Sequence, residues 1–99
     1  MGTPPYMAPE QHLGEELGPA VDQYAWSVTL WEALCGQRPF QEQQSAELVR
    51  TKLHGPPMWP RGTDAPRHVV DAIWRGLSPR PSDRFPSMNA LDPTTAAKP

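Results

Sequence analysis

Residues Asp22–Phe40, DQYAWSVTLWEALCGQRPF, decide how the rest of this 99-residue chain is arranged. Eight of the eleven residues from Ala25 to Cys35 are apolar, and at 3.6 residues per turn they cover almost the whole circumference of a helix. Such a helix is too short to cross a bilayer, which needs about 20 apolar residues. Asp22 is a suitable N-cap, Gly36 suits the position after the last turn, and Pro39 prevents the helix from continuing. We therefore predict a central core helix that needs cover on all sides. Because 99 residues offer little to cover it, we expect an exposed apolar patch on this helix.

The rest of the chain predicts further helices separated by long loops. A short helix begins at Pro9, and an amphipathic helix follows at Ser45–His54, in which Ala46, Val49 and Leu53 recur at helical spacing with Leu48 beside them. A third apolar stripe lies in Arg67–Leu77, where Asp71 and Arg75 are spaced as a favourable ion pair; the stripe comprises Val69, Val70, Ile73, Trp74 and Leu77. Because no segment alternates as a strand does, the predicted fold class is all-α.

Composition restricts the kinds of partner and compartment. The chain has 14 prolines, 37% hydrophobic residues and a net charge of −2, so it has no basic surface suited to nucleic acid. The first ten residues, MGTPPYMAPE, lack the basic and apolar regions of a signal peptide. The single cysteine, Cys35, cannot form an internal disulfide. We expect a cytoplasmic protein with no membrane segment and no nucleic-acid partner.

The chemistry-bearing residues form no recognisable catalytic motif. The three histidines share no zinc-ligand spacing with each other or with Cys35, and no serine stands in a G-x-S-x-G sequence. No G-x-G-x-x-G or G-x-x-x-x-G-K phosphate loop occurs either. We therefore assign no catalytic, metal-binding or cofactor-binding residue within this chain.

Three segments in order resemble hallmarks of the protein kinase family. Gly2–Glu10, GTPPYMAPE, is similar to the end of the activation segment with its A-P-E triplet. Asp22–Phe40 resembles the large central helix of the C-terminal lobe, including the ending Gly-x-x-Pro-Phe. Arg75–Met88, RGLSPRPSDRFPSM, resembles the last hallmark of that lobe. The Gly-Thr pair at 2–3 is typical of the serine/threonine class, and the style of all three segments is bacterial.

The resemblance implies roles for seven residues. Thr3 would lie beside the catalytic aspartate, and Pro4, Pro5 and Tyr6 would form the pocket for the residue after the phosphoacceptor. Glu10 and Arg84, 74 positions apart, would form the buried ion pair that anchors this pocket. Asp22 would accept hydrogen bonds from the catalytic-loop backbone. From the residues alone, Thr3–Tyr6 would be an inert proline turn and Asp22 an ordinary N-cap.

Other parts of the family pattern have no counterpart in these 99 residues. There is no glycine-rich loop, strand lysine, H-R-D catalytic loop or D-F-G; no histidine is followed by Arg and no aspartate by Phe. Those parts hold ATP and magnesium and supply the catalytic aspartate. We therefore expect no ATP or Mg cofactor in this chain, although the full-length family uses both, and we expect Met1 to be internal to a longer reading frame.

Taken together, the sequence is interpreted as the C-terminal-lobe part of a bacterial serine/threonine protein kinase, with a partial kinase domain at 2–91 and a disordered tail at 92–99. The family activity is ATP-dependent phosphoryl transfer to protein serine or threonine, and we expect this chain alone to be inactive. Its partners would be a protein substrate or the missing kinase half. Two alternatives remain: a non-catalytic module that docks a kinase or substrate partner, and a decayed gene product. The substrate, the activating signal and the oligomeric state are not indicated by the sequence.

Overall fold

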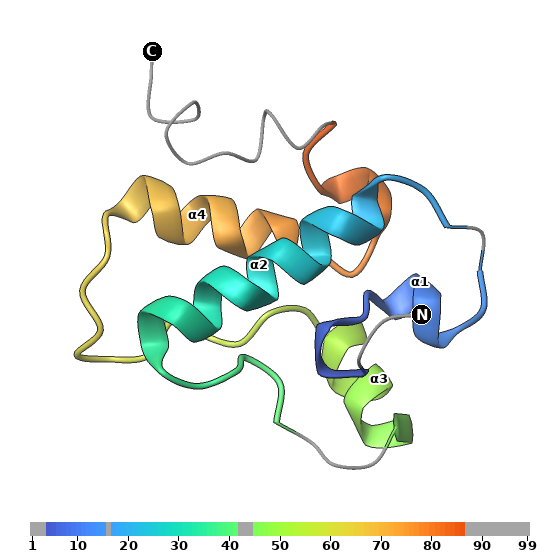
Figure 1. Ribbon diagram of the computed structural model, residues 1–99, viewed down its shortest axis with the longest axis horizontal. Helices are drawn as coiled ribbons and strands as arrows, with labels where there is room; N and C mark the ends of the chain where they lie inside the picture. The colour runs from blue at the N-terminus through green and yellow to red at the C-terminus, as the bar shows by residue number, and fades with distance from the viewer. Residues whose placement is uncertain (1–3, 16, 42–44, 87–99) are drawn as a thin grey trace.

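A computed structural model of the chain describes residues 4–15, 17–41 and 45–86. It contains four α-helices and two 3-10 turns (Figure 1), namely η1 (Pro4–Tyr6), α1 (Pro9–His12), α2 (Ala20–Cys35), α3 (Ser45–Leu53), α4 (Arg67–Gly76) and η2 (Pro81–Asp83). The described residues include no strand, which confirms the predicted all-α fold class. Within the same residues, none of the helices combines the length and the apolar character needed to span a membrane.

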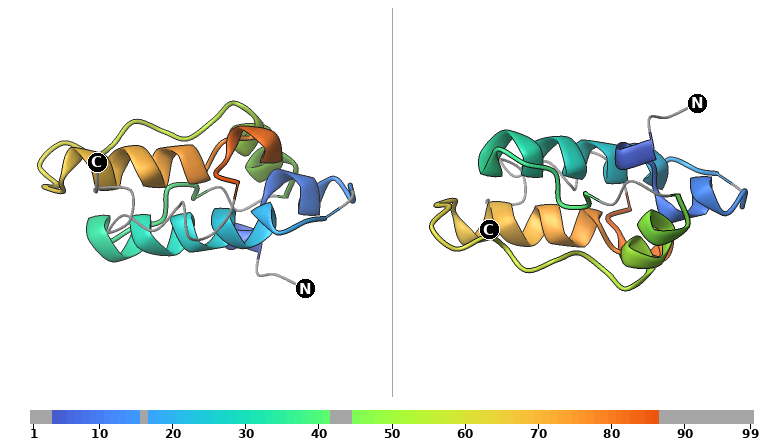
Figure 2. Two further views of the ribbon diagram at one scale, coloured as in Figure 1. Left: turned by 90° about the horizontal axis from the view of Figure 1, so that it is seen from above. Right: turned by 90° about the horizontal axis from the view of Figure 1, so that it is seen from below.

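Helix α2 is the element on which most others pack. It runs antiparallel to α4, and the two helices lie side by side in all three ribbon views (Figures 1 and 2). Both 3-10 turns also contact α2, whereas α1 packs on α3. The turns near the two ends of the described chain, η1 (Pro4–Tyr6) and η2 (Pro81–Asp83), are thereby brought to the same helix.

The ends of α2 follow from proline and glycine. The helix begins at Ala20, because Pro19 holds φ at −62° at the preceding position, and no side chain caps the first turn. The prediction of Asp22 as the N-cap is therefore wrong: Asp22 is the third residue of the helix, and its side chain is exposed. The predicted end is confirmed, since Gly36 adopts a left-handed φ of 78° and donates its N–H to the Glu32 carbonyl.

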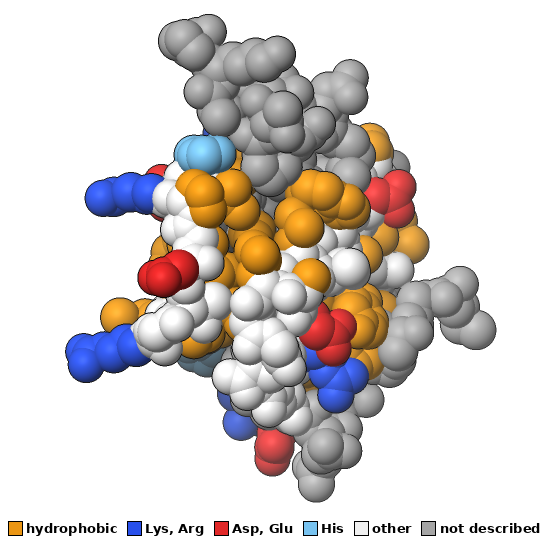
Figure 3. Space-filling view, turned by 60° about the vertical axis from the view of Figure 1, so that its left-hand side comes forward, with side chains coloured by type: hydrophobic (Ala, Val, Ile, Leu, Met, Phe, Trp, Pro, Cys, Tyr) orange, Lys and Arg blue, Asp and Glu red, His pale blue; other side chains and the backbone are white. Residues whose placement is uncertain are grey.

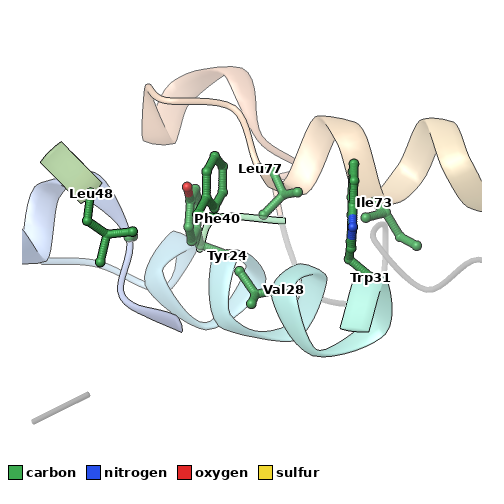
Figure 4. Close-up of a cluster of buried hydrophobic side chains, with 8 residues drawn as sticks. Tyr24, Val28, Trp31, Phe40, Leu48, Ile73 and Leu77 are labelled. Carbon is green, nitrogen blue, oxygen red and sulfur yellow. The ribbon is translucent and has the colours of Figure 1, made fainter. Parts of the chain in front are cut away.

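The core lies between α2 and α4 (Figure 4), and Val28, Trp31, Ile73 and Leu77 are each at most 2% exposed. The ring of Tyr24 stacks on that of Phe40, from the segment after α2, with centroids 6.3 Å apart. Because these side chains come from α2, α4 and a proline-containing loop, burial of apolar surface holds the three together.

Helix α2 is buried on one side and partly uncovered on the other, as predicted for a core helix in a chain of this length. Thr29 and Ala33 are exposed, Leu34 is 42% exposed, and Trp26 and Leu30 are only partly buried. The reason is that α4 is the helix that packs most extensively on α2, and a helix pair covers one side of each partner. Figure 3 shows hydrophobic side chains grouped on the face of the molecule where α2 ends and α4 begins.

Helix α3 buries a different face from the one that its apolar residues predict. Ala46 is exposed and Leu53 is 47% exposed, whereas Leu48 and Lys52 are 3% and 0% exposed. Lys52 is buried because its ammonium group donates to the Met7 carbonyl at 2.6 Å and lies 3.0 Å from Nε2 of His12. The buried face of α3 is therefore formed by Leu48 and, one turn later, by Lys52 with its hydrogen-bond partners, and not by Ala46 and Leu53.

Helix α4 confirms its predicted apolar stripe only in part: Ile73 and Leu77 lie in the core, but Trp74 is exposed. The predicted ion pair of Asp71 with Arg75 is wrong. The Asp71 carboxylate lies 3.8 Å from Nε of Arg67, on the exposed side. Arg75 instead places its guanidinium over the ring of Phe85, 4.3 Å from the centroid. Trp74 is 43% exposed and donates its indole N–H to the Pro57 carbonyl at 2.8 Å.

The buried ammonium group of Lys52 predicts a pH dependence of folding. Burial lowers the pKa of Lys52 to about 8 from an ordinary value of 10.5, so the unfolded chain binds this proton more tightly than the folded chain does. The contribution of Lys52 to stability should therefore rise with pH between about 8 and about 10.5, by at most about 1.4 kcal/mol per pH unit. Below about pH 8, Lys52 is protonated in both the folded and the unfolded chain, so its burial lowers the unfolding free energy by a constant amount.

The measurement is urea unfolding across this pH range for the chain and for Lys52→Met, which keeps the length of the side chain and removes its charge. Every other titrating group is common to both proteins, so only the difference between the two curves matters. We expect the unfolding free energy of the unmodified chain, minus that of Lys52→Met, to increase as the pH rises from about 8 to about 10.5. Parallel curves would show that the Lys52 ammonium is not desolvated in the folded chain.

Candidate functional site

The segment that the sequence singled out lies against α2. Thr3 lies outside the described residues, and Pro4, Pro5 and Tyr6 form the turn η1, which contacts α2. The Tyr6 hydroxyl donates a short hydrogen bond to Oε1 of Glu32, and this bond raises the pKa of Tyr6 above its ordinary value. Pro5 and Tyr6 are only partly buried, so this turn forms part of the molecular surface.

The Glu10 and Arg84 side chains meet in a bidentate ion pair, as the resemblance required. Nη1 of Arg84 lies 2.6 Å from Oε2 of Glu10, and Nη2 lies 2.9 Å from Oε1. The side chains are 3% and 0% exposed, so water does not screen the pair. Glu10 is in the first turn of α1, where the helix dipole favours a negative charge.

The guanidinium of Arg84 uses all five of its N–H donors. Besides the two bonds to Glu10, Nη1 donates to the Ala20 carbonyl at 3.1 Å, Nε to that of Ser78 at 2.9 Å, and Nη2 to that of Pro79 at 3.4 Å. Its central carbon also lies 4.9 Å from the centroid of the Tyr24 ring. A single side chain therefore joins α1, the start of α2 and the loop after α4.

Three further residues support this arrangement, and sequence reasoning missed all of them. The Gln23 side-chain amide donates to the Phe85 carbonyl and accepts from its N–H at 2.9 Å. Lys52 binds the Met7 carbonyl, and Glu32 binds Tyr6. No local pattern indicates these roles, because each partner is at least 26 positions away along the chain. Together the three hold residues 6, 7 and 85 in place.

Asp22 takes no part in these contacts; its side chain is exposed on the first turn of α2. That exposure leaves its carboxylate accessible to a group outside the described residues.

No cluster of three His, Cys, Asp or Glu side chains in the described part of the chain could hold a metal ion. The arrangement thus consists of a surface turn, Pro4–Tyr6, next to a helix, α1, that a buried ion pair joins to the rest of the fold.

Comparisons with known proteins identify relatives along most of the chain. The profile of the protein kinase domain matches residues 1–94. The chain is 39% identical over 96 residues to serine/threonine-protein kinase Pkn1 of Myxococcus xanthus, covering 92% of this chain and 13% of that protein. It is 35% identical over 97 residues to serine/threonine-protein kinase PknA of Mycobacterium tuberculosis, covering 98% of this chain and 22% of that protein.

Tyrosine-protein kinase MasK of Myxococcus xanthus is also similar, with 33% identity over 88 residues, 87% of this chain and 14% of MasK. The chain therefore spans less than a quarter of the length of each of these three relatives. The segments that match are those that the structure brings together around α2.

Removal of one partner of the buried ion pair should strongly destabilise the chain. Arg84→Gln leaves the Glu10 carboxylate buried without its cation, and such a loss costs about 3–5 kcal/mol of unfolding free energy. Arg80→Gln is the matched control, because Arg80 is exposed in the same loop and such surface changes stay within about 0.5 kcal/mol. Urea unfolding followed by tryptophan fluorescence measures both. Equal midpoints for the two variants would show that the pair does not hold the fold together.

Proposed function

This chain belongs to the protein kinase family, and we propose that it forms the part of a serine/threonine protein kinase that binds the protein substrate. In this proposal, residues 3–6 receive the substrate segment around the phosphoacceptor: Thr3 lies beside the catalytic aspartate, and Pro4, Pro5 and Tyr6 form the pocket for the following residue. The reaction of the whole protein is transfer of the γ-phosphoryl group of ATP to a serine or threonine hydroxyl.

The observation that carries the proposal is the bidentate contact of Glu10 with Arg84. It fixes α1 and, through the short connection Met7–Pro9, the turn at Pro4–Tyr6. The Tyr6–Glu32 and Lys52–Met7 hydrogen bonds attach the same segment to α2 and α3. A peptide-binding turn that is held before the peptide arrives loses little conformational entropy on binding.

ATP and magnesium fit the family but not the residues described here. The described part of the chain has no metal-ligand cluster, and the sequence has no glycine-rich loop and no D-F-G. We propose that the groups that bind ATP and magnesium and the catalytic aspartate lie outside these 99 residues. What this chain contributes is the orientation of the hydroxyl substrate, and ATP supplies the phosphoryl group when bound to the complete enzyme.

The incompletely covered side of α2 favours a second role that fits the same proposal. Trp26 and Leu30 are partly buried and Leu34 is 42% exposed, on a helix whose other side lies in the core. Asp22 and Thr29 are exposed on this helix as well, so apolar and hydrogen-bonding groups are both accessible. We propose that this side packs against the catalytic half of the kinase. A non-catalytic docking module would use the same surface for a partner kinase.

The proposal predicts that the 99-residue chain neither binds ATP–Mg specifically nor phosphorylates itself. Calorimetric titration should show no saturable binding with a dissociation constant below about 100 μM, equivalent to about −5.5 kcal/mol. Extension of the chain in frame with the DNA directly upstream should produce an enzyme that phosphorylates serine or threonine peptides. Saturable binding of ATP–Mg by the chain alone would contradict this division of roles. A stop codon directly upstream of Met1, with no sequence encoding H-R-D or D-F-G before it in any reading frame, would also contradict this division of roles.

A further inference from the structure

A hollow of about 680 Å³ lies beside the Glu10–Arg84 pair, and it is separate from the turn Pro4–Tyr6. Its walls come from residues 17–20, which lead into α2, and from Pro81, Ser82 and residues 84–86; Gln23 and Arg75 complete it. The side chain of Asp83, in η2, is exposed and does not line the hollow. In Figure 1 these two segments lie next to each other at the end of the molecule where α2 begins. The volume is within the range of roughly 300–1,000 Å³ that is typical of ligand sites.

The charged groups of the hollow are all positive. Arg75 and Arg84 line it, and no acidic residue does among those described. The charge of Arg84 is neutralised by Glu10, whereas Arg75 makes no ion pair with any described residue. The net charge of the chain is −2, so this cationic wall is a local feature and not a consequence of the overall composition.

Arg75 is held in position without losing its hydrogen-bonding capacity. Its guanidinium lies over the Phe85 ring, and the Gln23 amide holds the backbone of Phe85 in turn. A cation over an aromatic ring uses the face of the guanidinium, which leaves the N–H donors at its edge for an anion. The first turn of α2 also lies at the wall, but the exposed carboxylate of Asp22 in that turn offsets the positive end of the helix dipole, so Arg75 is the main source of positive potential.

The other walls combine the polar side chains of Gln23 and Ser82 with apolar side chains and two prolines. Leu17 is 56% exposed at one side, and the partly buried ring of Phe85 lies at the other. Pro19 and Pro81 have fixed backbone φ angles and limit how far the two segments can change shape. An occupant that covers Leu17 and Phe85 therefore gains hydrophobic burial without a large cost of ordering the protein.

We infer that this hollow binds an acidic peptide segment of a partner protein. A glutamate or aspartate carboxylate of the peptide lies on Arg75, and a neighbouring apolar side chain of the peptide lies between Leu17 and Phe85. A small inorganic anion would use Arg75 alone and leave the apolar walls uncovered. Nucleic acid is disfavoured because Arg75 is the one unpaired cation among the described residues of the site, whereas binding of nucleic acid depends on several cations.

The test uses a dye-labelled peptide of alternating leucine and glutamate, titrated into the 99-residue chain and followed by fluorescence anisotropy and by amide chemical shifts. We expect saturable binding, with the largest shift changes at residues 17–23, 75 and 81–86. The matched peptide of alternating leucine and glutamine should bind about tenfold more weakly, the equivalent of about 1.4 kcal/mol. Shift changes that centre on another surface would overturn the inference.

Two variants of exposed residues test the two walls separately. Arg75→Gln removes the available cation, and Leu17→Glu places a negative charge at the apolar wall; each should weaken binding of the acidic peptide about tenfold or more. Arg61→Gln removes an exposed loop arginine that does not line the hollow, and it should bind the peptide like the unmodified chain. Equal affinities for Arg75→Gln and Arg61→Gln would refute the assignment. Displacement of the peptide by an equal concentration of inorganic phosphate would also refute it, in favour of a small-anion site.

Discussion

The buried pair of Glu10 and Arg84 is the contact on which the arrangement of this chain depends. Transfer of two charges from water into the protein is costly, and it is tolerated only where the geometry and the remaining hydrogen bonds are good. Here the pair is bidentate, and three backbone carbonyls accept the other donors of the arginine. The loss of either partner would leave a stranded charge, so α1, the first turn of α2 and the loop after α4 are stable only together.

The fold needs this ion pair because α1 and η2 are too short to be stable as isolated helices. Helix α1 has four residues and η2 has three, far fewer than the roughly 12–15 at which an isolated helix becomes even marginally stable. Apolar packing between α2 and α4 provides a rigid base, and polar contacts from Gln23, Glu32, Lys52 and Arg84 attach the short segments to it. The division would suit the proposed substrate-binding role, because a surface turn can stay accessible while buried contacts fix its position.

Sequence reasoning predicted the parts of this fold that depend on local chemistry. Prolines and glycines mark the helix ends, so the end of α2 at Cys35 and the three other helices were predicted to within a residue or two. The contact of Glu10 with Arg84 came from the resemblance to a family, since no local pattern joins residues 74 positions apart. The buried face of α3 was predicted wrongly because apolar periodicity does not identify a lysine whose acceptor is a carbonyl 45 positions away. The Asp22 N-cap and the Asp71–Arg75 pair were wrong because Pro19 starts α2 earlier and Phe85 offers Arg75 an aromatic face.

The most direct test of the central claim is native-state hydrogen exchange of α1. Its amides Gln11 and Leu13 donate to the carbonyls of Ala8 and Pro9, which would open freely in an isolated four-residue helix. If Arg84 holds α1 to the fold, these amides exchange nearly as slowly as those of α2 in the unmodified chain. In Glu10→Gln they then lose protection by a larger factor than the α2 amides do. Protection of α1 that is unchanged in Glu10→Gln, or that is absent from the unmodified chain, would contradict the account.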